Sequence, residues 1–235
     1  MTDELNKTRR YLEQHHGGDG HRAAERTIDT HERNHDNDFW SFWYAHTPSG
    51  NALHIADLGC GPALFLKQLA QKHPDYRLTG IEIAPYMLAR VEDQPANLEI
   101  RIADLNAPGP AFFDSAPLDA CLANMLIHEL YQPINLFQAL RHWLKPGGVL
   151  ILTDMVRQPV VNFLHHKFPD LDFAHDPADA PTMHECFRDY FEHNRYSAED
   201  IEQLLKLCGF DVIERQTLRE GRATRIAARN AAHPT

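Results

Sequence analysis

Residues 55–63, Ile-Ala-Asp-Leu-Gly-Cys-Gly-Pro-Ala, constrain the fold of this chain more than any other stretch. The apolar start is typical of a strand that is covered on both faces, while Gly59 and Gly61 allow a sharp turn in which a ligand can approach the bare backbone. A helix that begins near Ala63 would point its unpaired amide groups at that ligand. The stretch therefore predicts a strand, a glycine turn and a helix that together cradle an adenosine-containing cofactor.

The residues that follow indicate which kind of cofactor this is. A dinucleotide-binding fingerprint has a third glycine three residues after the second, and this chain has Leu64 there. Residues 77–83 predict a second short strand that ends at Glu82, at about the separation of a ribose-binding carboxylate in a doubly wound sheet. A carboxylate in that position can accept hydrogen bonds from both ribose hydroxyls.

Two further strands are predicted in the same half of the chain. Residues 98–105 predict a third strand near whose end Asp104 could accept a hydrogen bond from the exocyclic amine of an adenine. Residues 118–125 predict a fourth strand, which ends at Asn124. Ligands of open α/β sheets bind at the carboxyl ends of the strands, where these polar side chains are expected to meet.

These segments resemble the class I S-adenosylmethionine-dependent methyltransferases of the small-molecule type. The match runs in order and at family-like spacing over roughly residues 52–229, and it is specific for cofactor and fold rather than for substrate. It is carried by Asp-Leu-Gly-Cys-Gly at 57–61, Gly-Ile-Glu at 80–82, Ala-Asp-Leu at 103–105, Asn-Met-Leu-Ile-His-Glu-Leu at 124–130 and Leu-Lys-Pro-Gly-Gly-Val-Leu at 144–150.

The resemblance implies S-adenosylmethionine as the cofactor and gives roles to individual residues. Asp57 and Gly59 would line its methionine end, Asp104 with Leu105 would meet the adenine, and Asn124 would lie beside the amino group. The family often has a glycine where this chain has Ala63. The implied cofactor-binding set is Asp57, Gly59, Cys60, Gly61, Glu82, Ile83, Asp104, Leu105, Asn124 and Met125.

The order of the predicted elements implies an α/β fold. Alternating strands and helices predict a Rossmann-like, doubly wound, mainly parallel sheet, with a turn at 145–148 that leads into a fifth strand at 149–154. Near the C-terminus, strand-like runs at 210–218 and 222–228 are separated by three residues, which predicts a hairpin and therefore one antiparallel strand. A seven-stranded sheet with that ending is typical of the resembled family.

Two segments lie outside the predicted sheet. Residues 1–50 are charged and rich in histidine, and their aromatic run at 39–44 must pack on something; we interpret the segment as a helical lid or as a helix that seals the core. The methyltransferase domain would span residues 51–235, with a helical cap insertion at about 155–196 that precedes a helix predicted from Ser197 to Cys208. An insertion at the carboxyl edge of the fifth strand is expected to cover the substrate.

Composition limits the class of partner. The chain has 235 residues, of which 43% are hydrophobic, which is enough for one large domain. Its net charge of −10 disfavours a nucleic-acid substrate, and no apolar stretch is long enough to span a membrane. Four scattered cysteines are typical of reduced thiols. We expect a cytoplasmic enzyme with a small-molecule acceptor and no nucleic-acid or membrane partner, and a homodimer is compatible with the sequence.

Methyl transfer needs an aligned nucleophile and, where the nucleophile carries a proton, a base. His128 follows the fourth strand and is the best candidate for that base, with Glu129 as a weaker one; the alternative is that His128 only lines the pocket. An arginine in the cap would favour a carboxylate or phosphate on the acceptor. The candidate substrate-binding residues are Tyr44, Tyr131, His184, Arg188 and Tyr190.

Two histidine patterns raise the question of a metal. His31 and His35 flank Glu32 at the spacing that places two zinc ligands on one helix face, but the segment is charged and no third ligand is evident. We interpret these residues as solvated helix positions. The adjacent His165 and His166 are only slightly better candidates, and we predict no metal.

Three other functions stay open. A nicotinamide-dependent oxidoreductase would need the missing third glycine and an all-parallel sheet. A non-catalytic cofactor-binding module would keep Glu82 and Asp104 and tolerate any residue at position 128. A protein methyltransferase would need a groove open to a polypeptide, whereas a lid and a cap favour an enclosed site.

Overall fold

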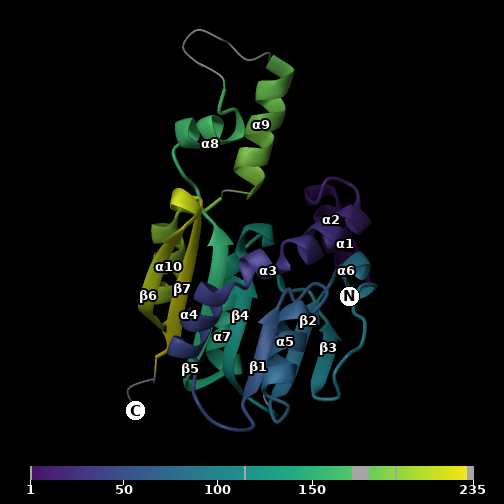
Figure 1. The fold of residues 1–235 in the computed structure, drawn as a ribbon, viewed down its shortest axis with the longest axis vertical. Coiled ribbons are helices and arrows are strands. Elements are labelled where there is room, and N and C mark those ends of the chain that lie inside the picture. Colours follow the sequence, from purple (N-terminus) through teal and green to yellow (C-terminus); the bar gives the residue numbers. More distant parts are fainter. Residues whose placement is uncertain (1, 114, 171–179, 194, 232–235) are drawn as a thin grey trace.

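The computed structural model describes residues 2–113, 115–170, 180–193 and 195–231. Its centre is a seven-stranded sheet with the strand order β3-β2-β1-β4-β5-β7-β6 (Figure 1). Strand β7 pairs antiparallel with both β5 and β6, and the other neighbouring strands pair in parallel. The strands are β1 (His54–Leu58), β2 (Arg77–Glu82), β3 (Leu98–Ile102), β4 (Leu118–Asn124), β5 (Leu144–Met155), β6 (Phe210–Leu218) and β7 (Ala223–Asn230).

This arrangement confirms the predicted fold class, a mainly parallel sheet with an antiparallel strand at its C-terminal end. Solvent is excluded from all five residues of β1, as the apolar start of residues 55–63 predicted, since helices cover both faces of a parallel sheet. The predicted hairpin is present, and a 3₁₀ turn, η3 (Arg219–Gly221), joins β6 to β7.

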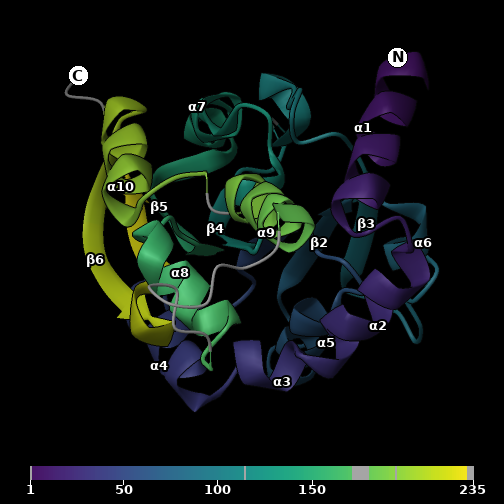
Figure 2. The same ribbon diagram turned by 90° about the horizontal axis from the view of Figure 1, so that it is seen from above.

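Helices pack on both faces of the sheet (Figure 2). On one face, aromatic side chains of α4 form a core with α5 and the strands, and on the other face α7 and α10 do the same. The helices of the core are α4 (Asn37–His46), α5 (Leu64–Lys72), α6 (Pro85–Leu88), α7 (Pro133–Trp143) and α10 (Ala198–Leu207), with short 3₁₀ turns η1 (Pro110–Phe113) and η2 (Ile127–Glu129).

Element boundaries differ from the predicted ones where local contacts override the apolar pattern. Strand β3 ends at Ile102, two residues before Asp104, because the chain turns into a loop there. The predicted turn at 145–148 is part of β5, and the pairing of β5 with β4 shifts register in that region. Helix α10 begins after Ser197, whose side chain and that of Asp200 cap its first turn, as the sequence indicated.

The N-terminal segment is helical throughout most of its length. It contains α1 (Thr2–His15), α2 (Gly20–Asp29) and α3 (His31–Asn34), followed by α4. Helix α4 packs in the core through Phe39, Phe42 and Trp43, so this aromatic run covers part of one face of the sheet. Helices α1 and α2 lie beyond the carboxyl ends of β1 to β3 (Figure 1).

The predicted cap contains α8 (Val160–Lys167) and α9 (Ala180–His193). Both stand on the carboxyl edge of the sheet, and α9 points away from it, so only its C-terminal end reaches the body of the domain (Figures 1 and 2). Residues 171–179 of the predicted cap lie outside the described residues. Among the residues that are described, no helix is both long enough and apolar enough to cross a membrane.

Candidate active site

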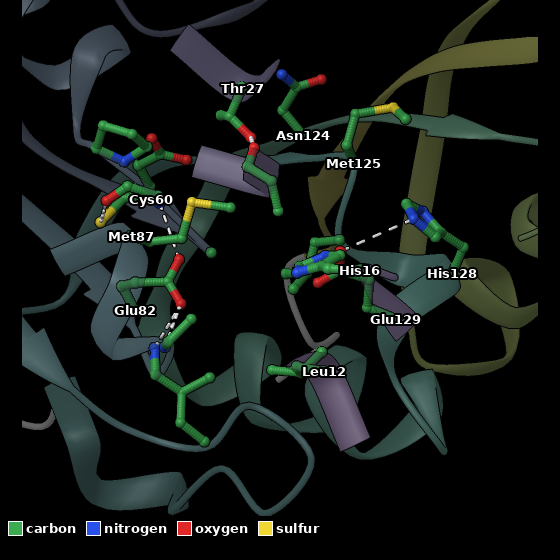
Figure 3. Close-up of a pocket in the computed structure, with 18 of the residues that line it drawn as sticks. Leu12, His16, Thr27, Cys60, Glu82, Met87, Asn124, Met125, His128 and Glu129 are labelled. Carbon is green, nitrogen blue, oxygen red and sulfur yellow. Dashed lines mark hydrogen bonds and ion pairs between the residues drawn. The ribbon is translucent and has the colours of Figure 1, made fainter. Parts of the chain in front are cut away.

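A cavity of about 560 Å³ lies at the carboxyl ends of β1, β2 and β4 and extends under α1 and α2. Figure 3 shows Glu82 on one side of this hollow and His16, His128 and Glu129 on the other. The structure places all ten predicted cofactor-binding residues and both predicted catalytic residues in its lining: Asp57, Gly59, Cys60, Gly61, Glu82, Ile83, Asp104, Leu105, Asn124, Met125, His128 and Glu129.

The glycine turn after β1 keeps a bare strip of backbone facing the cavity. Gly59 has a φ of +71°, and a Cβ added there would lie 3.1 Å from the Cδ1 atom of Leu126. Ala63 also adopts the left-handed conformation, with a φ of +60°, directly before α5. The alanine that replaces the family's frequent glycine therefore keeps the glycine-like turn, in a conformation that is strained for a residue with a side chain.

Glu82 ends β2 and is held in one orientation by backbone donors. Its Oε1 atom accepts from the N–H groups of Ile83 and Ala84, each at 2.7 Å, and its Oε2 atom accepts from the N–H of Gly61 at 2.9 Å. Burial raises the pKa of Glu82, and these three hydrogen bonds oppose the rise. A carboxylate has about four lone-pair positions, so a position stays available to a ribose hydroxyl.

Asp57, at the end of β1, lies beneath the glycine turn and is 5% exposed. Burial and then the charge of Glu82 raise its pKa to about 8. A buried acid with such a pKa favours a positively charged ligand group, because a nearby cation stabilises the ionised form. The amino group of S-adenosylmethionine is a cation of the right kind for this end of the cavity.

Asp104 lies in the loop after β3, against α1. Its Oδ2 atom accepts from the hydroxyl of Thr8 at 2.6 Å, and its Oδ1 atom accepts from the backbone N–H of Asn106 at 2.9 Å. One residue further along α1, the guanidinium of Arg9 donates to the carbonyl oxygen of Ile83 at 2.9 Å. Helix α1 therefore covers the end of the cavity where the adenosine is expected.

His128 lies in η2, just after β4, and is held by Asp154 at the end of β5. The Nδ1 atom of His128 is 2.6 Å from Oδ1 of Asp154, which is fully buried. Backbone N–H groups of Ile127 and Met155 donate to the same carboxylate at 2.5 and 2.7 Å. Since the carboxylate accepts the Nδ1 proton, the Nε2 atom keeps its lone pair.

The protonation of this imidazole is set by opposing effects. Burial disfavours its charged form, but the charge and hydrogen bond of Asp154 and the charge of Glu129 outweigh burial, so the pKa of His128 is raised. Burial would likewise raise the pKa of Glu129, but the hydrogen bond and charge of His16 and the charge of His128 hold it below its usual value. The site thus pairs an anionic Glu129 with a readily protonated His128.

Two adjacent histidines lie at the same end of the cavity, His15 as the last residue of α1 and His16 in the turn that follows it. The ring nitrogens of His16 lie 2.7 Å from the hydroxyl of Tyr86 and 2.7 Å from Oε1 of Glu129. His15 is buried, and burial and then the charge of His193 lower its pKa to about 3. The rings of His15 and His193 meet at a centroid distance of 4.2 Å.

Sequence reasoning missed four residues that line the cavity, Thr8, His15, His16 and His193, and it missed Asp154, which bonds to His128. Asp154 carried a usable signal, because it ends a predicted core strand where parallel strands present functional side chains. The histidines carried none, since they lie on helices whose position relative to the sheet is set by tertiary contacts.

The predicted substrate-binding residues are not among those that line the cavity. Tyr44 lies on α4, where its hydroxyl is 3.0 Å from Nε2 of His73. Tyr131 is half-exposed beside α1, with its ring 4.7 Å from that of Tyr11.

The other three predicted substrate-binding residues lie on α9. The side chains of His184 and Arg188 are exposed. The side chain of Tyr190 is buried against Phe163, and its hydroxyl donates a hydrogen bond to the carbonyl oxygen of Gln158. Because α9 points away from the sheet, the described residue of this helix that lines the cavity is His193, at its C-terminal end.

The histidine pair at α3 is not solvated, contrary to our interpretation of its sequence. His31 and His35 stack at a ring-centroid distance of 4.4 Å, and the Nε2 atom of each is buried without a hydrogen-bond partner. Burial, followed by the charge of His31, lowers the pKa of His35 to about 3. Glu32, the middle acid of the motif, is exposed.

Comparison with known proteins identifies a methyltransferase domain within this chain. Residues 56–152 match the protein family described as "Methyltransferase domain". A trans-aconitate 2-methyltransferase from Azoarcus sp. (strain BH72) is 33% identical over 108 residues, which are 46% of this chain and 41% of the relative. The chain thus aligns with less than half of the length of this curated relative.

Two solved structures share the fold. Phosphoethanolamine N-methyltransferase 2 from Haemonchus contortus, in complex with S-adenosylhomocysteine, aligns with a TM-score of 0.66 and 15% identity over 96% of this chain and 60% of that one. An S-adenosylmethionine-dependent methyltransferase from Mesorhizobium loti aligns with a TM-score of 0.59 and 18% identity over 81% of this chain and 96% of that one. With the sheet order and the glycine turn, these findings show that the chain has the fold of the class I S-adenosylmethionine-dependent methyltransferases and that residues 56–152 match a methyltransferase domain.

Proposed function

We propose that this protein transfers a methyl group from S-adenosylmethionine to a small-molecule acceptor by in-line displacement. The observation that carries the proposal is that one cavity contains both the predicted cofactor residues and His128. The cofactor side presents the carboxylates of Asp57, Glu82 and Asp104. The opposite side presents the lone pair of His128 at Nε2, where an acceptor would meet the methyl group.

The cavity fits the cofactor in shape and in charge. The bare backbone at Gly59 leaves room where a Cβ would crowd Leu126, and Glu82 is already oriented by three backbone donors. S-adenosylmethionine supplies a methyl carbon made electrophilic by a positive sulfur. The residues of this chain then have to bind and align the acceptor, exclude water and receive a proton where the acceptor carries one.

His128 is suited to the acceptor side for a geometric reason. Asp154 fixes both the orientation and the tautomer of the ring, so its Nε2 atom has one direction in which to act. We propose that this nitrogen meets the nucleophilic group of the acceptor, with Glu129 and His16 beside it. A lid role for the N-terminal segment is supported by the contacts of Thr8 with Asp104 and of Arg9 with Ile83.

The other functions predict different behaviour. An oxidoreductase is disfavoured by the antiparallel C-terminal strand. A protein methyltransferase is disfavoured by the helix α1 that covers the cavity. The curated relatives are named for trans-aconitate, but the alignment covers too little of them to transfer that substrate to this chain.

We also propose a cytoplasmic location without a nucleic-acid partner. Analytical sedimentation tests whether the protein is a homodimer.

Calorimetric titration with S-adenosylmethionine and S-adenosylhomocysteine tests the proposal, with NAD as the control ligand. We expect binding of both adenosyl ligands and none of NAD. A panel of small acids, amines and thiols, with S-adenosylhomocysteine formation as the readout, then tests transfer. Folded protein that binds neither adenosyl ligand would contradict the proposed function, and binding without transfer to any acceptor would favour a cofactor-binding module.

A further inference from the structure

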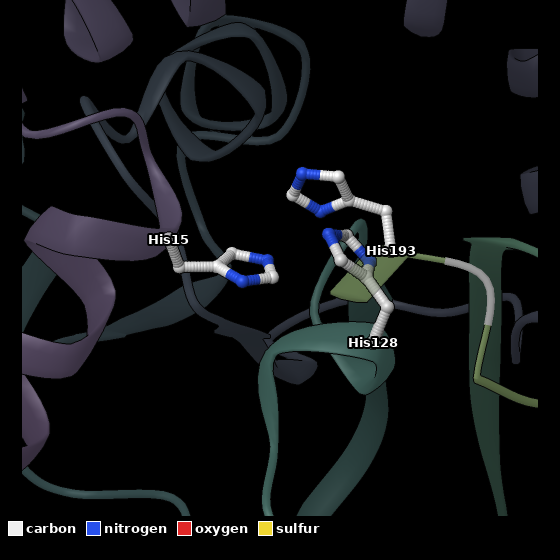
Figure 4. Close-up of side chains that lie close together, drawn as sticks. All are labelled: His15, His128 and His193. Atoms are coloured by element: carbon white, nitrogen blue, oxygen red, sulfur yellow. The ribbon is translucent and has the colours of Figure 1, made fainter. Parts of the chain in front are cut away.

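We propose that His15, His128 and His193 hold a divalent transition-metal ion, best matched by Zn²⁺, at the acceptor end of the cavity. The three side chains come from α1, from η2 and from the end of α9, and they converge on one point (Figure 4). Each offers one ring nitrogen, and these nitrogens lie within 4.8 Å of one another. The proposal rests on the proposed function, since it says how this site engages the acceptor.

The spacing is close to that of a three-histidine zinc site. Nitrogens about 2.1 Å from a tetrahedral Zn²⁺ lie roughly 3.4 Å apart. The three nitrogens therefore need to approach one another by at most about 1.4 Å, which ring rotations and a small shift of α1 or α9 can supply. Both helices that carry the outer ligands end at those residues, His15 and His193.

The local chemistry of two of these histidines points to a ligand. The Nε2 atom of His15 is buried and has no hydrogen-bond partner, which is unusual for a polar atom in a folded protein. The Nδ1 atom of His128 is bonded to Asp154, the carboxylate–histidine arrangement that orients metal-binding imidazoles. The outward lone pair of His128 is thereby directed at the point where His15 and His193 meet.

A metal in this position would keep an open coordination site. Three protein ligands and one open position are typical of catalytic rather than structural zinc. The cavity that holds the cofactor residues also contains all three histidines. A bound cation would orient an oxygen, nitrogen or sulfur atom of the acceptor and lower the pKa of that group.

Metal binding and direct base action use the same lone pair of His128, so they are alternatives at one atom. With the ion bound, Glu129 is the neighbouring group that can take the acceptor's proton, since its Oε1 atom lies 4.0 Å from Nε2 of His128. His16 holds that carboxylate from the other side at 2.7 Å. In this arrangement Glu129 takes over the role first assigned to His128.

Metal titration of chelator-treated protein tests the proposal directly. Co²⁺ reports its own coordination through its visible absorption bands, and Zn²⁺ should displace it. We expect one equivalent to bind with the spectrum of a four-coordinate site. The His15→Ala and His193→Ala variants should each weaken the binding at least about tenfold.

The control must account for the other histidines of this chain, which has 16 histidines in total, including the three proposed ligands. His21 is exposed on α2, so His21→Ala should bind Co²⁺ like the wild type. Circular dichroism checks that each variant folds, and His193→Gln, which keeps most of the side-chain volume, replaces any variant that does not.

The outcomes separate the two proposals. Metal-free protein that binds S-adenosylhomocysteine but takes up no equivalent of Co²⁺ or Zn²⁺ would overturn the metal site alone. Uptake that is unchanged in the His15 and His193 variants would do the same, because surface histidines would then be the ligands. Loss of S-adenosylhomocysteine binding in folded protein would contradict the proposed function instead.

Discussion

The imidazole of His128 and the carboxylate of Asp154 form a buried pair whose Nδ1 and Oδ1 atoms are 2.6 Å apart, and this pair aims the other ring nitrogen into the cavity. His128 lies in η2, the short turn after β4, and Asp154 lies at the end of β5, the neighbouring strand. The carboxylate also accepts backbone N–H groups from both segments, so it ties the two strand ends together. The orientation of the His128 ring toward the acceptor thus depends on Asp154, a residue that does not itself face the acceptor.

Replacing Asp154 with asparagine should separate positioning from binding. The amide cannot enforce the same tautomer of His128, so we expect kcat to fall by roughly ten- to a hundredfold. The affinity for S-adenosylhomocysteine should stay within about twofold of the wild type, because the cofactor residues are untouched. Steady-state kinetics and calorimetry on the same preparation measure both values. An equal loss of kcat and of cofactor affinity would indicate general unfolding of the site rather than a positioning role.

Glu82→Gln should weaken cofactor binding. The substitution keeps the size of the side chain but removes the charge that accepts from three backbone groups and, by our proposal, from the ribose. Hydrogen bonds to charged groups contribute about 1.5–3 kcal/mol, so the Kd for S-adenosylhomocysteine should rise by roughly ten- to a hundredfold. Glu99→Gln, at an exposed glutamate of β3, is the matched control. Equal Kd values for wild type and Glu82→Gln would contradict the ribose assignment.

Cofactor binding should release a proton from Asp57. Its pKa of about 8 leaves the side chain mostly protonated at pH 7, and a ligand ammonium group favours the ionised form. Calorimetry in phosphate and in Tris should therefore give apparent enthalpies that differ in proportion to the release of up to about one proton. The Asp57→Asn variant should abolish the difference, and identical enthalpies for the wild type in both buffers would exclude the proton release.

The same pKa predicts how Asp57 contributes to stability. A carboxyl whose folded-state pKa is raised from 3.8 to about 8 binds more protons folded than unfolded between those values. Its contribution is therefore fully present below about pH 4 and is lost as the pH rises through about 8. Urea unfolding measures the free energy of unfolding of the wild type and of Asp57→Asn as the pH rises from about 4 to about 8. This free energy should fall less in the variant than in the wild type. Parallel pH dependences would contradict the raised pKa.

His16→Ala should loosen helix α1. The substitution removes the contacts of the ring with Glu129 and Tyr86, and it leaves a buried carboxylate without one partner. We expect a loss of about 1–3 kcal/mol in the free energy of unfolding and faster hydrogen exchange in α1. Arg10→Ala, at an exposed position of the same helix, is the control. Unchanged exchange in α1 would show that other contacts hold the helix in place.

Much of the cofactor half of the site was predictable because it is local in sequence. Gly59, Glu82 and Asp104 each lie at or just after the end of a core strand, and parallel strands in one sheet must end at one edge. Strand order and spacing therefore place these residues around one cavity, whatever the surrounding helices do.

The acceptor half of the site was not predictable in the same way. His15 and His193 lie 178 positions apart in the chain (193 − 15 = 178). Both lie on helices whose positions do not follow from the order or the register of the strands. The predicted contribution of His184 and Arg188 depended on the direction in which α9 runs, and this helix points away from the sheet. Helical spacing identifies which residues share a face, but the axis of a helix is set by its packing partners.

The mainly parallel sheet, its antiparallel ending and the glycine turn that faces Glu82 can all be predicted from the order of residues along the chain. Apolar strand patterns, turn residues and strand ends act over a few neighbouring positions, so they can be recognised locally. Three contacts emerge only from the folded chain: α1 lies over Asp104, Asp154 orients His128, and His15 and His193 meet the ring of His128. These contacts join segments far apart in the chain, and they form because each segment buries its own face against the assembled sheet.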